Sequence, residues 1–114
     1  MMMVETVLRQ SQIHGVGVFL AQRVEAGQLI WRFDSRIDRV YAPEEIESLP
    51  AHVQRYLRTY STWHAQAGLF VLCGDNAKWM NHSDEANTAA VFEGAWPRSR
   101  ALRPGPLQGS EIAA

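Results

Sequence analysis

A single helical stretch interrupts a chain that otherwise consists of short strand-like runs. The runs are rich in β-branched and aromatic residues, and turns containing glycine, asparagine or aspartate separate them. They fall at Val4–Leu8, 15–21, Leu29–Phe33, Ile37–Tyr41, Leu69–Cys73, Thr88–Phe92 and Ser99–Leu102. The pattern predicts a mainly β fold of about six or seven short strands, and it is not the strand–helix alternation of a doubly wound nucleotide-binding fold.

The helical insert is expected at about residues 43–60. Pro43 suits the first helical turn because its missing N–H is not needed there, and the acids that follow it suit the positive end of the helix dipole. Apolar and aromatic side chains then recur at helical spacing, at Val53, Tyr56, Leu57 and Tyr60. Pro50 is expected to interrupt the insert, and Pro104-Gly105-Pro106 to break regular structure near the C-terminal end.

Size and composition predict one domain over residues 1–114. The net charge of −1 gives no clustered basic face for nucleic acid. No apolar run reaches the roughly 18 residues that a membrane span needs, and no signal peptide is visible, so the cytoplasm is the expected location.

Cys73 is the only cysteine, which excludes an intramolecular disulfide and a cysteine-rich zinc cluster. Its neighbours Val71 and Leu72 are apolar, so a buried, unreactive thiol is expected. His82 has no second histidine three or four positions away, so no metal site is predicted.

Gly15-Val16-Gly17 admits more than one interpretation. A dinucleotide-binding loop would need a third glycine at position 20, which is Leu20, and a following helix. Two alternatives remain: a strand entered through a flexible glycine turn, or a backbone that approaches a ligand closely because no side chain intervenes.

Asn81-His82-Ser83 follows an apolar stretch and precedes Asn87. Polar residues in such a place commonly form a loop or a helix cap. A serine nucleophile is not favoured, because Ser83 is not in a Gly-x-Ser-x-Gly elbow. The residues alone leave open whether Asn81 is a cap or a ligand.

Three segments taken together resemble the SET domain of protein-lysine methyltransferases, over nearly the whole chain. The first is 11–21 with its Gly15-Val16-Gly17-Val18-Phe19 element, followed by a Gly27 turn. The second is 75–87, with Asn81-His82-Ser83 and the trailing Asn87, and it is the most specific. The third is 101–112, which is similar to the family's closing Ala-x-Arg and Gly-Glu-Glu-Leu elements.

The resemblance implies a SET-type β-clip fold whose C-terminal segment threads beneath an earlier loop. It implies S-adenosylmethionine as cofactor and transfer of a methyl group to a lysine of a protein substrate. Gly15, Val16 and Gly17 would approach the methionine part of the cofactor, and Asn81 would bind its amino group. The backbone of His82 would pair with adenine, and Tyr60 would border the lysine channel as the catalytic-site tyrosine.

The last motif departs from the family pattern. Ser110 replaces a glutamate, and where the family continues to a tyrosine beside the reacting methyl group only Ala113 and Ala114 follow. The resemblance therefore implies a compact SET domain with an incomplete C-terminal motif. Its alternative function is that of a non-catalytic domain that binds the cofactor or a protein. A homodimer that covers a strand edge is a further hypothesis.

Overall fold

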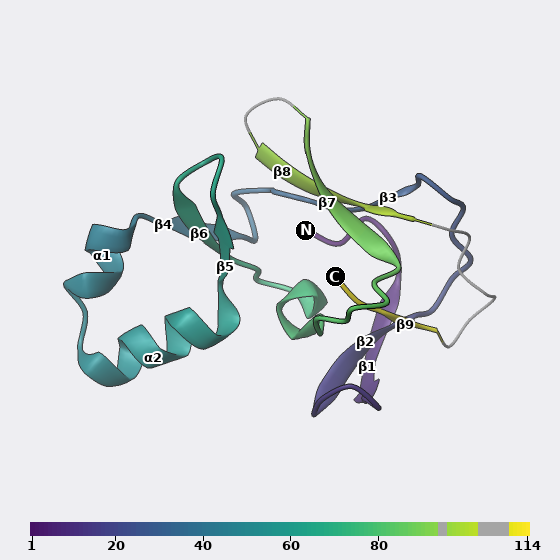
Figure 1. Cartoon of the computed structure of the whole chain (residues 1–114), viewed down its shortest axis with the longest axis horizontal. Coiled ribbons are helices and arrows are strands. Elements are labelled where there is room, and N and C mark those ends of the chain that lie inside the picture. The colour runs from purple at the N-terminus through teal and green to yellow at the C-terminus, as the bar shows by residue number, and fades with distance from the viewer. Residues whose placement is uncertain (94–95, 103–109) are drawn as a thin grey trace.

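The computed structural model describes residues 1–93, 96–102 and 110–114. Within these residues, three small antiparallel sheets form the fold (Figure 1). The strand orders are β1-β2-β9, β3-β8-β7 and β4-β6-β5. The strands are β1 (Thr6–Gln10), β2 (Val16–Leu20), β3 (Leu29–Arg32), β4 (Arg39–Tyr41), β5 (Thr62–His64), β6 (Leu69–Leu72), β7 (Thr88–Glu93), β8 (Trp96–Ala101) and β9 (Glu111–Ile112).

The structure confirms the mainly β fold, and each predicted run overlaps a strand, although β1 and β8 are displaced from the predicted bounds by up to three residues. Two strands among the described residues, β5 and β9, were not predicted from periodicity. They have only three and two residues, too few to show an alternating pattern. The predicted break at Pro104-Gly105-Pro106 lies outside the described residues.

The helical insert forms as two helices, α1 (Pro43–Glu47) and α2 (Ala51–Tyr60). Pro43 occupies the first turn of α1, and the Glu45 side chain accepts a hydrogen bond from the Ala42 N–H at 3.0 Å, which satisfies a donor at the helix start. Pro50 immediately precedes α2, as the predicted interruption requires. The helices lie at one end of the molecule, beside the sheet of β4, β5 and β6 (Figure 1). No described helix is long and apolar enough to cross a bilayer.

A core cluster of the described residues joins the first two sheets. Apolar side chains from β2, β3, β8 and β9 meet there with residues of the connecting segments: Val4, Val18, Leu20, Val24, Ile30, Ala101 and Ile112. Trp79 and Met80 pack against this cluster, so the short helix η1 (Asn76–Trp79) and the residue after it are fixed to the core. This contact places the next residue, Asn81, in a defined position.

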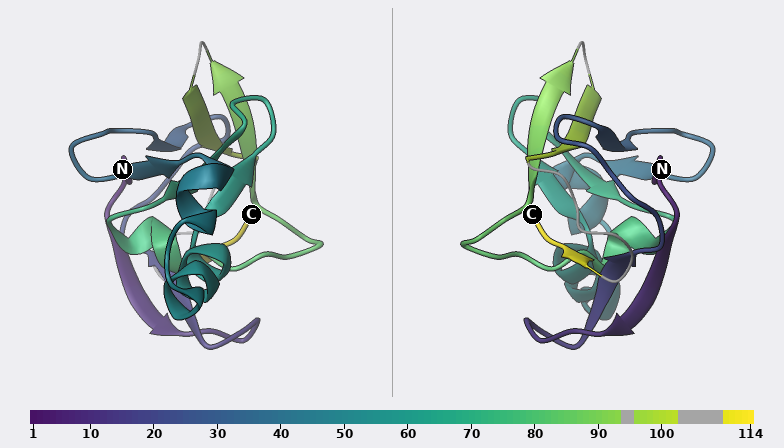
Figure 2. Two further views of the ribbon diagram at one scale, coloured as in Figure 1. Left: turned by 90° about the vertical axis from the view of Figure 1, so that its left-hand side faces the viewer. Right: turned by 90° about the vertical axis from the view of Figure 1, so that its right-hand side faces the viewer.

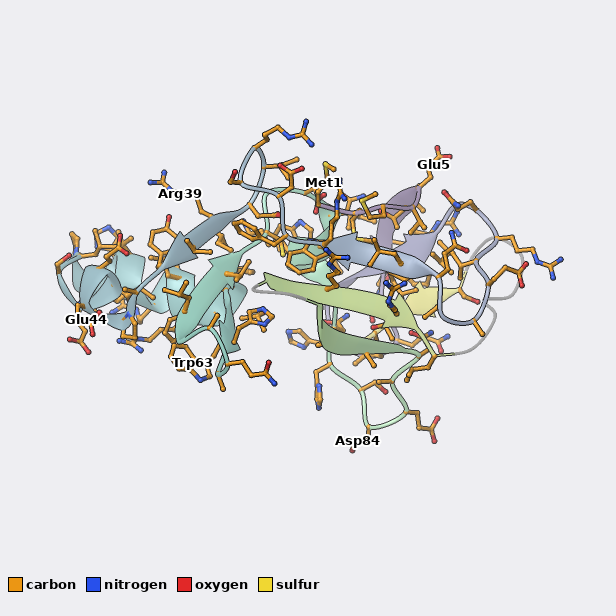
Figure 3. All side chains as sticks on the ribbon, turned by 90° about the horizontal axis from the view of Figure 1, so that it is seen from above. Met1, Glu5, Arg39, Glu44, Trp63 and Asp84 are labelled. Atoms are coloured by element: carbon orange, nitrogen blue, oxygen red, sulfur yellow. The ribbon has the colours of Figure 1, made fainter. Side chains whose placement is uncertain are left out.

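The C-terminal segment lies beside the loop that precedes β7 (Figure 2). Asn81 forms a parallel bridge with Ala113, and the Ser83 N–H donates to the Ala114 carbonyl at 2.9 Å. The Asn87 side chain holds the same segment at two points: Nδ2 donates to the Glu111 carbonyl and Oδ1 accepts from the Ala113 N–H, both at 2.9 Å. This arrangement matches the threaded end that the resemblance implies. At the tip of the loop Asp84 projects away from the ribbon (Figure 3).

Candidate functional site

The structure brings the glycine bend and Asn81 together, although they are far apart in sequence. Asn81 Nδ2 donates to the carbonyl of His14 at 2.9 Å and to that of Val16 at 3.2 Å. Asn81 caps no described helix: the N-cap of η1 is Asp75, whose carboxylate accepts from the Ala77 N–H at 3.1 Å. The cap interpretation of Asn81 is therefore wrong, and the amide instead fastens the bend to the loop.

The orientation of the Asn81 amide is fixed by its surroundings. Besides the two carbonyls, Ser11 Oγ lies 3.0 Å and Glu111 Oε1 3.1 Å from Nδ2. Four oxygen atoms thus surround the nitrogen, and exchanging the amide nitrogen and oxygen would set oxygen against oxygen. Among the described residues none donates a hydrogen bond to Asn81 Oδ1. This oxygen can accept from a ligand.

The two glycines of the bend have different roles. Gly15 has a φ of +46°, in the left-handed region that side chains other than glycine disfavour. Gly17 is buried, and a Cβ there would lie 1.9 Å from Glu111 Oε1 and 2.8 Å from Glu111 Cδ. Gly15 therefore allows the chain to turn, whereas Gly17 allows a carboxylate to approach the backbone.

His82 and Val16 lie on the accessible side of this cluster. Val16 is 46% exposed, and the His82 side chain is also exposed. No hydrogen bond joins the backbone N–H or C=O of His82 to another described residue, although both neighbours of His82 are bonded to the C-terminal segment. An unpaired donor and acceptor on one residue suit the edge of a heterocyclic base.

A cavity of about 200 Å³ lies next to this cluster, on the side of Met80 rather than Asn81. Its lining includes Tyr60, at the end of α2, together with Met80 and Ala114. Trp31 also lines it, is 6% exposed, and has an Nε1–H without a hydrogen-bond partner in the described part of the chain. The cavity is smaller than the roughly 300–1,000 Å³ of sites for drug-sized ligands, so it suits a single side chain.

Burial shifts the pKa values of two ionisable side chains that line the cavity, Cys73 and His64. Burial, with a contribution from the Asp38 charge, raises the pKa of Cys73 to about 12, so this thiol stays protonated at neutral pH. Burial likewise lowers the pKa of His64 and favours the neutral imidazole. The raised pKa agrees with the predicted unreactive thiol, although Cys73 is half-buried and not fully buried as predicted. No group of three or more histidine, cysteine or acidic side chains in the described ranges could hold a metal ion.

Lys78 lies in a cage of three aromatic rings beside the cavity. Its Nζ is 4.7 Å from the ring centroid of Tyr56, 4.9 Å from that of Tyr60 and 5.1 Å from that of Trp79. Nζ also donates a hydrogen bond to the Tyr56 hydroxyl. All three distances are within the range of cation–π attraction. The cage therefore connects η1 to α2 and fixes Tyr60. The sequence placed Tyr56 and Tyr60 on an apolar stripe, but Tyr56 is 44% exposed.

Replacing Lys78 with methionine should destabilise the protein by about 1–2 kcal/mol, because the side chain keeps its length but loses its attraction to the three rings. Chemical denaturation of both proteins measures this difference. Arg58→Met, an exposed position on α2, is the matched control and should change stability by less than about 0.5 kcal/mol. Equal effects of the two substitutions would contradict the cage as a stabilising contact.

Comparison with known proteins identifies the fold. No protein-family model matches the sequence, and no curated protein matches it. Among solved structures, the chain is similar to a candidate histone methyltransferase of Plasmodium falciparum, with a TM-score of 0.65 and 18% identity over 96% of this chain and 90% of that one. It is also similar to polycomb repressive complex 2 of Chaetomium thermophilum, with a TM-score of 0.70 and 20% identity over 96% of this chain and 15% of that one.

Another similar structure is of ctPRC2 in an autoinhibited conformation bound to S-adenosylmethionine, with a TM-score of 0.70 and 20% identity over 96% of this chain. The chain spans 15% of that protein. These similarities show that the chain has the fold of SET-domain methyltransferases, as its motifs predicted. At such low identity they establish the fold alone.

Two polar residues of the site were missed by sequence reasoning. Neither Glu111 nor Ser11 was singled out from the sequence, and they fall only within the segments 101–112 and 11–21 that carry the resemblance. Their link is a hydrogen bond from Ser11 Oγ to Glu111 Oε1 at 2.7 Å between residues 100 positions apart. No local pattern signals such a contact. Gly17 leaves room for the Glu111 carboxylate, and this role can be recognised only once the pairing of β2 with β9 is known.

Proposed function

We propose that the protein is an S-adenosylmethionine-dependent protein-lysine N-methyltransferase. The observation that carries the proposal is the meeting of Asn81 with the Gly15–Gly17 bend, with Oδ1 of Asn81 left to accept a hydrogen bond. Similarity to a structure bound to S-adenosylmethionine supports the same proposal through the fold.

The residues of the cluster fit the cofactor group by group. Asn81 Oδ1 would accept from the amino group, and the bend would lie along the methionine part. The free backbone groups of His82 would pair with adenine. When bound, the cofactor supplies an electrophilic sulfonium methyl group. Met80 lines the cavity and the next residue, Asn81, belongs to the cluster, so the two sites would be adjacent.

The cavity would receive the lysine side chain of a protein substrate. Only a neutral amine is nucleophilic, and with a reference pKa of about 10.4 only about one lysine in two thousand is neutral at pH 7. Apolar walls from Trp31 and Val71 favour the neutral form by desolvation. Tyr60 is held at the cavity by its ring contact with Trp79, 5.4 Å between centroids, and would border and align the substrate.

Asn81→Ala should weaken binding of S-adenosylhomocysteine about tenfold to a hundredfold, because a hydrogen bond to a charged group contributes about 1.5–3 kcal/mol. Calorimetric titration measures the dissociation constant. Ser83→Ala is the matched control. Within the described residues the Ser83 hydroxyl has one hydrogen bond, from the Glu85 N–H at 3.1 Å, so this variant should bind S-adenosylhomocysteine as tightly as the wild type. Unaltered affinity of the Asn81 variant would reject Asn81 as a ligand.

Turnover is tested separately from binding. Incubation with methyl-labelled cofactor and cell extract should label protein lysines if the enzyme is active. Tight binding without any labelling would instead support the alternative, a non-catalytic domain that binds cofactor. The absence of both would reject the whole proposal and leave a domain that acts by protein contact.

A further inference from the structure

The carboxylate of Glu111 lies at the centre of the Asn81 cluster. Glu111 Oε1 accepts hydrogen bonds from Ser11 Oγ at 2.7 Å and from Asn81 Nδ2 at 3.1 Å. It also lies directly over Gly17, where any Cβ would collide with it. β9 runs beside β2 (Figure 1), with Glu111 opposite Phe19, so the short last strand brings this carboxylate next to the bend. Three segments of the chain thus converge on one acidic oxygen.

Glu111 is half-buried and has no cation to balance it among the described residues. None of the ion pairs in that part of the chain includes Glu111. Arg9 stands opposite Gly17 in the β1–β2 ladder, but it forms no ion pair with Glu111. Its guanidinium lies over the Phe19 ring instead, 6.0 Å from the ring centroid. A carboxylate that is partly removed from water and lacks a counter-ion favours a cationic ligand.

The other groups at this place are also mainly acceptors. Asn81 Oδ1 has no described donor, and the carbonyls of His14 and Val16 point into the cluster. An ammonium group has three N–H donors and no acceptor, so it complements such a set. A carboxylate or phosphate would instead meet repulsion from Glu111.

We propose that Glu111 is the anionic partner of the α-ammonium group of the cofactor, and that it also orients the Asn81 amide so that Oδ1 faces that group. This inference rests on the proposed function and adds a residue and a charge requirement to it. Ser11 is a positioning residue in this scheme, because its hydroxyl donates to Glu111 and holds the carboxylate over Gly17.

The test compares two ligands on two proteins. Glu111→Gln keeps the side-chain shape and an oxygen that accepts from Ser11 and Asn81, but it removes the charge. S-adenosylhomocysteine carries the ammonium group, and 5′-methylthioadenosine lacks the amino-acid part. The substitution should lower the affinity for S-adenosylhomocysteine about tenfold or more and change the affinity for 5′-methylthioadenosine less than twofold. Calorimetric titration measures both dissociation constants.

The outcomes separate this inference from the proposed function. If wild-type protein binds S-adenosylhomocysteine and Glu111→Gln leaves that affinity unchanged, or weakens both ligands equally, the role of Glu111 is refuted and the cofactor site stands. If wild-type protein binds neither ligand, both proposals fail. Should Glu111→Gln not fold, Ser11→Ala replaces it and should give a smaller loss confined to S-adenosylhomocysteine; an equal loss for both ligands would again refute the role.

Discussion

Asn87→Ala should destabilise the protein by about 2–5 kcal/mol. The side chain makes two hydrogen bonds to the threaded C-terminal segment, and alanine leaves the Glu111 carbonyl and the Ala113 N–H without these partners. Each unsatisfied buried group costs about 1–3 kcal/mol. The same segment carries Glu111 to the Asn81 cluster, so under the proposed function the affinity for S-adenosylhomocysteine should fall together with stability. Urea denaturation at fixed temperature gives the difference in unfolding free energy.

The control for this prediction is Asp84→Ala in the same loop. Asp84 is exposed and projects from the loop tip, so its replacement should change stability by less than about 0.5 kcal/mol (Figure 3). If the two variants unfold at the same urea concentration, the two hydrogen bonds of the Asn87 side chain do not stabilise the C-terminal segment in solution.

Gly74→Ala should also be strongly destabilising, by about 1–3 kcal/mol or more. A Cβ at position 74 would lie 1.8 Å from the carbonyl oxygen of Ile37 and 2.9 Å from its carbonyl carbon. The Ile37 carbonyl belongs to the backbone and cannot rotate away from the added Cβ as a side chain could, so the chain around Ile37 would have to shift. That segment is fixed by the buried carboxylate of Asp38, which accepts from the Gly74 N–H at 3.3 Å and from the Asp34 N–H at 3.0 Å.

Gly17→Ala is the informative comparison, because the same added carbon meets a flexible side chain there. The Glu111 carboxylate can move aside, so the loss of stability should be smaller than at Gly74, whereas the loss of S-adenosylhomocysteine affinity should be larger. Thermal unfolding and titration of both variants measure the two effects. A Gly74 variant as stable as the wild type would show that the contact with Ile37 is not tight.

The sequence predicted the parts of the fold that depend on local pattern. Pro43 and Pro50 marked the two helix starts, and the strands with clear β-branched composition were found. The strands β5 and β9 were missed because their pairing with β6 and β2 is set by tertiary contacts and not by periodicity. The threaded end was expected from the family resemblance alone.

The candidate site was predictable only in part for a similar reason. The Gly15–Gly17 bend and Asn81 are motif residues, and motif order indicated that they would meet. The unpaired carboxylate of Glu111 and the aromatic cage around Lys78 depend on contacts between distant segments. A glutamate at position 111 and a lysine at position 78 are not unusual in their local sequence, so their roles become visible only in the three-dimensional structure.

A crystal structure of the protein grown with S-adenosylhomocysteine would test the proposed cofactor site most directly. We expect the ligand to lie against the Gly15–Gly17 bend, with its amino nitrogen about 3 Å from Asn81 Oδ1 and its adenine on the backbone of His82. A ligand that binds elsewhere in the crystal, or a protein that crystallises without the ligand at saturating concentration, would rule out this cofactor site.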